Sequence, residues 1–167
     1  MRKLFLLPLL SAAVLSLQAC THSIETETTI DAQPEAVWAV LTDFAAYPEW
    51  NPFVTRIQGA AETGTHLEVR IRGCGQEGMT FTPEVLAAKA GESFRWKGHL
   101  FLPGLFDGEH GFHIRRDGSG GVRFVQRERF SGLLVPFIAG SIEESTRCGF
   151  ERMNAALKAR AEAPVVR

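Results

Sequence analysis

The stretch 30–54, "IDAQPEAVWAVLTDFAAYPEWNPFV", predicts two short helices in succession, with a strand on either side. Pro34 suits the first position of a helix, where the N–H that proline lacks would have no partner within the helix. The apolar residues that follow it recur at helical spacing and define one buried face. They are Val37, Trp38, Val40, Leu41 and Phe44. A shorter second helix or turn is expected over 45–50, because Pro48 and Pro52 interrupt the pattern.

On both sides of this stretch the apolar residues change to the period of two that is typical of strands. Residues 22–31 alternate and predict one strand before the helices. Alternating segments also follow it, at 53–57, 66–72, 79–85, 94–97, 106–114 and 122–130. Consecutive strands joined by short turns form an antiparallel sheet. The sequence therefore predicts a seven-stranded antiparallel sheet.

A long C-terminal helix is expected to cover the apolar face of this sheet. Ser141 and Glu144 match a capping box, which places the start of the helix at Ser141. A start at Pro136, with Gly140 inside the helix, is the alternative. One face of the sheet alternates apolar and needs a cover, and no other predicted element is long enough to provide it. The predicted fold class is α+β, in the order β-α-α-β6-α.

This order of elements, together with the stretch 30–54, resembles the START-like helix-grip superfamily, often grouped as SRPBCC. The residues that carry the resemblance are Pro34, Glu35, Val37, Trp38, Leu41, Phe44, Tyr47, Trp50, Asn51 and Pro52. Two later stretches, "FDGEHGF" at 106–112 and "FERMNAALKARAE" at 150–162, look like its polyketide cyclase/dehydrase-like branch. The resemblance covers about residues 24–162. It implies a sheet wrapped around a long helix with an apolar cavity between them, and no single chemistry.

The first residues resemble a bacterial lipoprotein signal peptide. Arg2 and Lys3 precede an apolar segment over 4–17, which is too short to span a membrane. "LQAC" at 17–20 resembles the lipoprotein box, in which a cysteine thiol receives diacylglycerol. We expect a signal peptide over 1–19, lipidation of Cys20 and a START-like domain over 20–167, with an ordinary secretory signal as the alternative. Thr21 follows Cys20, which by resemblance to enterobacterial lipoproteins favours the outer membrane, facing the periplasm.

The inward face of the expected sheet is rich in large apolar side chains: the chain has 12 Phe and 3 Trp against 1 Tyr. A packed core is one interpretation of this face. The other is a ligand cavity, which is mostly apolar with a few polar groups. The ligand-binding residues expected in that case are Trp50, Phe53, Phe81, Trp96, Phe106, His110, Phe112, Phe124, Gln126 and Glu128.

Three of these residues are polar: His110, Gln126 and Glu128. If the last hairpin turns over 117–120, the numbers of paired residues sum to about 236, so that His110 faces Gln126 and Glu128 lies on the diagonal. A buried histidine beside a carboxylate can act as a general base or orient a ligand. A structural polar cluster is the alternative. No catalytic residue is assigned, because no nucleophile or metal set accompanies the three.

Other features exclude some classes of site. The formal net charge of −1 gives no electrostatic basis for nucleic-acid binding. The 5 histidines lack metal-ligand spacing, and no cofactor is implied. Cys74 and Cys148 lie at the same end of the predicted topology, so a disulfide is geometrically possible. The sequence favours two free thiols, because helix placement alone does not bring Cα atoms within ~7 Å.

Two apolar segments are expected to face each other at one end of the sheet. They are "LFLPGLFDGEH" at 100–110 and "FSGLLVPFIAG" at 130–140. Together they would form a door to the cavity, close to the bilayer that holds the lipid anchor.

Three functions remain open on this sequence. The first is a monomeric, membrane-anchored protein whose partners are a hydrophobic small molecule or lipid and, through Cys20, the bacterial envelope membrane. The second is a polyketide cyclase/dehydratase-type enzyme using His110 and Glu128, which predicts a pocket that reaches His110. The third is a ligand-free interaction protein of the envelope, which predicts a solid core and a large exposed apolar patch.

Overall fold

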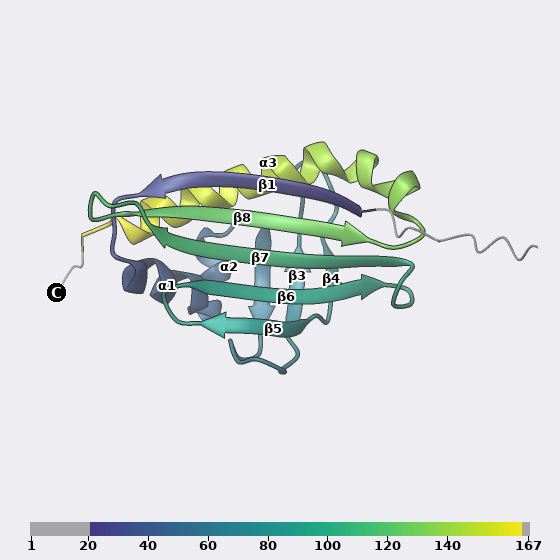
Figure 1. Ribbon diagram of the computed structural model, residues 1–167, viewed down its shortest axis with the longest axis horizontal. Coiled ribbons are helices and arrows are strands. Elements are labelled where there is room, and N and C mark those ends of the chain that lie inside the picture. The colour runs from purple at the N-terminus through teal and green to yellow at the C-terminus, as the bar shows by residue number, and fades with distance from the viewer. Residues whose placement is uncertain (1–20, 165–167) are drawn as a thin grey trace, which may run out of the picture.

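A five-stranded antiparallel sheet and a long C-terminal helix dominate the computed structural model, which describes residues 21–164 (Figure 1). In chain order the elements are β1 (Thr21–Ile30), α1 (Pro34–Thr42), η1 (Phe44–Ala46), α2 (Tyr47–Trp50), β2 (Val54–Gln58), β3 (Glu68–Ile71), β4 (Met79–Phe81), β5 (Glu84–Lys89), β6 (Ser93–Leu100), β7 (Phe106–Arg116), β8 (Val122–Ser131) and α3 (Val135–Ala161). The larger sheet has the order β1-β8-β7-β6-β5, and a three-stranded sheet has the order β2-β3-β4. Helix α3 packs against β1 and β8 (Figure 1). The α+β helix-grip prediction is confirmed.

The helical stretch after β1 forms as its sequence predicts. Pro34 occupies the first turn of α1, and Val37 and Leu41 turn inward and are buried. The hydroxyl of Tyr47 in α2 donates a hydrogen bond of 2.7 Å to the carbonyl of Leu41, which ties the two helices together. Burial of that phenol raises the pKa of Tyr47 far above its ordinary value. The side chain of Asn51 then accepts from the backbone N–H of the two residues that lead into β2.

The structure has eight strands where the sequence predicted seven. The segment 79–85 is divided into β4, which pairs with β3, and β5, which pairs with β6. Pro83 lies at the division because it has no N–H to donate to a strand ladder. Its carbonyl accepts a 2.9 Å hydrogen bond from Leu67 N–H, and a bridge between His66 and Glu84 joins the two sheets. The two sheets together form one wall.

Helix α3 begins at Val135, so the predicted start at Ser141 is wrong and the alternative near Pro136 is right. The hydroxyl of Ser141 donates a 2.7 Å hydrogen bond to the carbonyl of Ile138, one turn back in the same helix. It therefore does not cap a helix end. Pro136 is accommodated in the first turn, where the helix needs no N–H from it.

Gly149 allows α3 to pack closely against the strand side of the molecule. A Cβ at position 149 would clash with the ring of Phe53. That ring packs edge-on against Phe150, with the centroids 5.1 Å apart. Phe150, Met153 and Leu157 of α3 are completely buried. The absence of a side chain at Gly149 thus brings the apolar face of the helix into the core.

Candidate functional site

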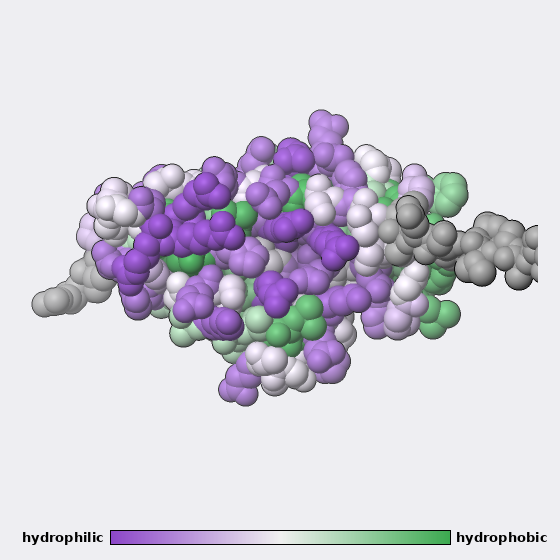
Figure 2. All heavy atoms as spheres, in the orientation of Figure 1, coloured by the Kyte–Doolittle hydropathy of each residue, from purple (hydrophilic) through white to green (hydrophobic). Residues whose placement is uncertain are grey.

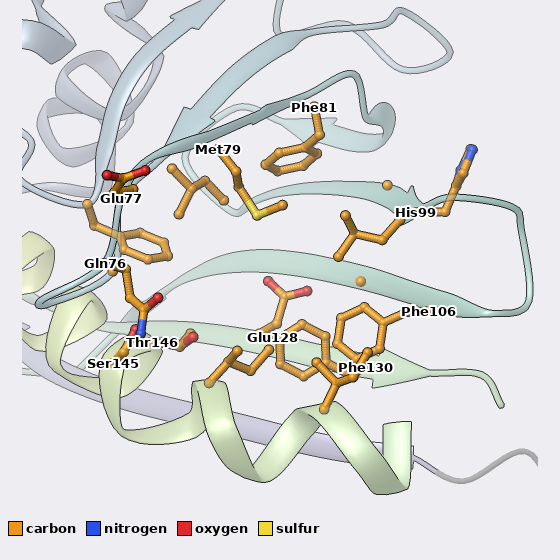
Figure 3. A pocket seen from close by; sticks show the side chains of 18 of the residues that line it. Gln76, Glu77, Met79, Phe81, His99, Phe106, Glu128, Phe130, Ser145 and Thr146 are labelled. Atoms are coloured by element: carbon orange, nitrogen blue, oxygen red, sulfur yellow. The ribbon is translucent and has the colours of Figure 1, made fainter. Parts of the chain in front are cut away.

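A cavity of about 310 Å³ lies between β6, β7 and β8, the β3–β4 segment and the first turns of α3 (Figure 3). Most of the residues that line it are apolar. They are Phe53, Ile71, Gly73, Gln76, Glu77, Met79, Phe81, Trp96, Gly98, His99, Leu100, Phe106, Gly108, Glu128, Phe130, Ile138, Ile142, Ser145 and Thr146. Its volume falls at the lower end of the range of small-molecule pockets.

Half of the predicted ligand-binding residues line this cavity. Phe53, Phe81, Trp96, Phe106 and Glu128 do so, while Trp50, His110, Phe112, Phe124 and Gln126 do not. Phe112 and Phe124 pack into the core, and Trp50, a residue of α2, packs against it beside Tyr47. The predicted inward face thus borders the cavity with one half of these residues, and the side chains of the other half are packed in or against the core.

His110 and Glu128 are directly opposite one another on β7 and β8, and Gln126 lies on the diagonal. This corrects the predicted register, in which Gln126 faced His110. The turn between these strands runs over 117–121 and is closed by a 3.1 Å hydrogen bond from Asp117 N–H to the carbonyl of Gly121. Because the turn is centred farther along the chain than predicted, each residue of β7 pairs with one farther along β8.

The His110 ring is enclosed by aromatic side chains. It stacks on Trp96 with centroids 4.8 Å apart and meets Phe112 at 4.6 Å and Phe150 at 5.1 Å. His110 is only 2% exposed and does not line the cavity. Its Nδ1 lies 2.8 Å from Glu128 Oε2. The imidazole therefore acts on the cavity only through this carboxylate.

Gln126 lies against the second ring nitrogen of His110. The amide nitrogen of Gln126 lies 3.2 Å from His110 Nε2 and 3.5 Å from Met153 Sδ. A thioether sulfur can only accept, so the amide presents its N–H₂ to this side. The two ring nitrogens of His110 contact different partners: Nδ1 contacts Glu128 and Nε2 contacts Gln126. His110 thus links Glu128, which lines the cavity, to Gln126 in the core.

Glu128 is the polar group at the floor of the cavity, where its carboxylate points into the space between the sheet and α3 (Figure 3). Its side chain is 10% exposed. Gly108 on β7 leaves the room for it, because a Cβ at that position would lie 2.7 Å from Glu128 Oε1. One carboxylate oxygen thus bonds His110, and the other faces the cavity.

Residues of the β3–β4 segment and of α3 complete the wall, and the sequence did not identify them. Gln76 of the segment lies near Ser145 and Thr146 of α3, and Glu77 of the same segment lines the cavity farther from the helix (Figure 3). Backbone N–H of Cys74 donates a 3.1 Å hydrogen bond to the carbonyl of Ser145. The spacing of apolar residues in the sequence does not indicate that the β3–β4 segment lies against α3. This arrangement depends on a contact between distant parts of the chain.

Cys74 and Cys148 form a disulfide, with their Cα atoms 5.9 Å apart, which overturns the prediction of free thiols. The sequence placed both residues at one end of the fold but lacked the short contact that the β3–β4 segment makes with α3. Gly73 fits closely against Ser145, where a Cβ would clash with the hydroxyl oxygen. The disulfide holds one wall of the cavity against the helix.

Exposed hydrophobic side chains gather at one end of the molecule, in what we term the apolar patch: Phe101, Leu102, Leu133 and Phe137 (Figure 2). Phe101 is 76% exposed and Phe137 is 80% exposed. The two segments meet there as predicted, because backbone N–H of Leu133 and Leu134 donate to the carbonyls of Gly104 and Leu105. Leu100 and Ile138, which adjoin the patch in sequence, line the cavity.

Asp107 holds the hairpin tip in place beneath the apolar patch. Its carboxylate accepts a 2.9 Å hydrogen bond from Gly104 N–H and lies 3.1 Å from the ammonium nitrogen of Lys97. Partial burial acts to raise the pKa of Asp107, but the hydrogen bonds from Gly104 and Lys97 and the positive charge of Lys97 outweigh it. The pKa is therefore below the usual value, and the carboxylate stays ionised at neutral pH.

Residues 21–164 were also compared with the requirements of a membrane-spanning helix and of a metal site. No helix there combines the length and apolar character needed to cross a bilayer. No cluster of three or more His, Cys, Asp or Glu side chains there has the arrangement of a metal site.

Solved structures with the same architecture support the assignment of the fold. The di-domain ARO/CYC BexL from the BE-7585A biosynthetic pathway superposes with a TM-score of 0.69 at 14% identity, over 86% of this chain and 51% of that one. The chain thus spans about half the length of that protein. A START superfamily protein from Mycobacterium smegmatis gives a TM-score of 0.65 at 20% identity, over 84% and 97% of the two chains. A norcoclaurine synthase from Thalictrum gives 0.67 at 13% identity, over 87% and 96%.

At these identities the structural likeness concerns the fold alone. Among curated proteins no sequence matches the chain. The family described as "Polyketide cyclase / dehydrase and lipid transport" matches residues 21–162, which is nearly all of the described chain. Together with the fold, this match confirms the resemblance to the polyketide cyclase-like branch of the START-like superfamily and indicates a ligand-binding or cyclase role. The chain belongs to the polyketide cyclase / dehydrase and lipid transport family.

Proposed function

We propose that the protein binds a hydrophobic small molecule or lipid in the cavity, and that it does so while anchored to a membrane. The observation that carries the proposal is the cavity of about 310 Å³ whose walls are largely apolar. Transfer of apolar ligand surface from water into such a site contributes about 25 cal/mol per Å² before ordering costs. A ligand-free interaction protein would instead have a solid core.

Native mass spectrometry tests whether the cavity holds a ligand. We expect the mature chain, with Cys20→Ser to remove the acylation site, to retain a lipid-like molecule when it is purified from its own host. Ile142→Trp places a larger side chain in the cavity and should lower ligand occupancy about tenfold or more. Glu151→Trp, on the exposed face of the same helix, is the matched control and should leave occupancy unchanged. Equal occupancy in both variants would place the ligand elsewhere.

The membrane part of the proposal rests on residues outside those that the structure describes, namely the signal peptide over 1–19 and Cys20. Three observations on the described residues support it. Thr21 begins β1 opposite Ser131, which lies two positions before Leu133 of the apolar patch. The patch would therefore lie next to a lipid anchor at Cys20. The Cys74–Cys148 disulfide suits an oxidising compartment such as the periplasm.

The backbone at Phe101 gives the third observation. This residue has a φ of 66°, in the left-handed region that non-glycine residues seldom adopt, and it presents its ring to solvent. Residues held in sparsely populated backbone conformations cluster at functional sites. A bilayer surface would bury these rings, so we propose the outer membrane, facing the periplasm, as the site of action.

Vesicle sedimentation tests this placement. The Cys20→Ser chain is expected to bind neutral phosphatidylcholine vesicles weakly, and Phe101→Ser/Phe137→Ser should lower the partition coefficient at least tenfold, since each buried Phe contributes about 1.5–3 kcal/mol. Met79→Ser removes an exposed apolar residue on β4 and serves as the control. If the control and the double variant lose binding equally, the patch is not the membrane contact.

A cyclase or dehydratase is the second candidate, and the contact between Glu128 and His110 favours it. The cavity reaches Glu128 but not His110, so a substrate would meet the pair through the carboxylate alone. Glu128 would then be the acid–base group and His110 a positioning residue. Turnover of a polyketide-type substrate that is lost in Glu128→Gln, with substrate binding retained, would establish this function.

A further inference from the structure

We propose that the ligand presents a hydrogen-bond donor, a hydroxyl or an ammonium group, to Glu128 Oε1, and that the cavity rejects ligands ending in a carboxylate. This inference rests on the proposed binding function and names the chemical class of the ligand. Its basis is the arrangement of charge and hydrogen-bonding capacity around Glu128.

The free oxygen of Glu128 is the first step. Within the described chain the carboxylate is bonded through Oε2 to His110, and Oε1 faces the cavity beside Gly108. The residue is only 8% exposed. A buried carboxylate oxygen that has lost water gains most from a donor, and charge-assisted hydrogen bonds are the strong ones.

The charge of the site is the second step. In the described chain Glu128 pairs with no lysine or arginine, and its partner is the imidazole of His110. The lining residues include a second acid, Glu77, and no lysine or arginine. His99 is the remaining basic residue of the lining, and its ring points away from the cavity (Figure 3). An anionic ligand head would meet negative charge and find no fixed cation.

The shape of the site is the third step. Phe106, Phe130 and Trp96 surround Glu128 with apolar surface, so a hydrocarbon tail can pack while the head reaches the carboxylate. Gly108 is the residue that keeps the approach to Oε1 open, because a methyl group there would lie 2.7 Å from this oxygen. The ligand class that matches these features is an apolar molecule with one donor at its end.

Calorimetric titration of three ligands with the same tail tests the inference. The mature Cys20→Ser chain contains every helix and strand of the fold and is titrated with 1-decanol, 1-decylamine and decanoate at neutral pH. We expect the alcohol and the amine to bind at least tenfold more tightly than decanoate. Glu128→Gln should remove this preference, because the amide carries no charge and can donate to a carboxylate. Glu151→Gln, an exposed acid on α3 outside the lining, is the matched control and should keep it.

A second variant covers the case in which Glu128→Gln does not fold. Gly108→Ala should weaken binding of the alcohol and the amine about tenfold while leaving decanoate unchanged, because the new methyl group obstructs Oε1 alone. Equal binding of all three ligands to the unaltered chain would overturn the inference and leave the proposed function intact. Failure of all three to bind, with native mass spectrometry also showing an empty protein, would overturn the proposed function itself.

Discussion

His110→Ala is expected to lower the free energy of unfolding by about 3–5 kcal/mol, the largest loss that a single substitution near the site should cause. The substitution removes a buried ring packed among Trp96, Phe112 and Phe150. It also leaves the carboxylate of Glu128 in an apolar setting without its donor, which costs more than the loss of a hydrogen bond alone. Urea denaturation followed by circular dichroism measures the change.

A double-mutant cycle separates the ion–dipole contact from the packing. Glu128→Ala removes the carboxylate that bonds His110, so His110→Ala/Glu128→Ala should cost about 0.5–3 kcal/mol less than the sum of the single variants. His113→Ala is the matched control, because His113 lies on the same strand but outside the core and should cost less than about 1 kcal/mol. Additive single effects would mean that His110 is held by packing alone.

Part of the fold was predictable because its signals are local. Pro34 and the apolar face of α1 specify a helix from their spacing, and strong alternation specifies β7 and β8. The division at Pro83 was not predictable in the same way. The alternation of apolar residues continues through Pro83. The chain is divided there because β4 pairs with β3 in one sheet and β5 pairs with β6 in the other.

The error in register at the site has a definite physical reason. A shift of two residues keeps every side chain on its own face of the sheet, so a hydrophobic pattern cannot distinguish the two registers. The length of the turn decides between them. Asp117 Oδ1 accepts hydrogen bonds from the N–H of Ser119 and Gly121, which stabilises the longer turn and aligns His110 with Glu128.

In the candidate site, too, the residues with local sequence signals were predicted and those that depend on distant contacts were not. Strand residues such as Phe106 and Glu128 were predicted to face inward, and they line the cavity. Gln76 and Ser145 were missed, because a loop and a helix far apart in the sequence reach the cavity only through their mutual contact. The disulfide between Cys74 and Cys148 secures that contact, and two cysteines alone did not reveal it.

Removal of this disulfide is expected to lower the free energy of unfolding by about 2–4 kcal/mol, because the bond closes a long loop in the unfolded chain. The two cysteines are separated by 74 positions in the sequence. Cys74→Ser/Cys148→Ser is the variant, and guanidinium denaturation is the measurement. Reductant should destabilise the unaltered chain by a similar amount and leave the double variant unchanged, which controls for effects of the serine side chains.

The double variant should also affect the cavity, beyond its effect on global stability. The segment that carries Gly73, Gln76 and Glu77 would be held to α3 by little more than the hydrogen bond between Cys74 N–H and Ser145. We therefore expect faster amide hydrogen exchange over 72–78 and faster release of a bound ligand under conditions where the protein is fully folded. Faster exchange that is spread evenly over the sheet would instead mean that the disulfide stabilises the fold as a whole. Alkylation of both thiols in the native, unreduced protein would show that the bond is not formed.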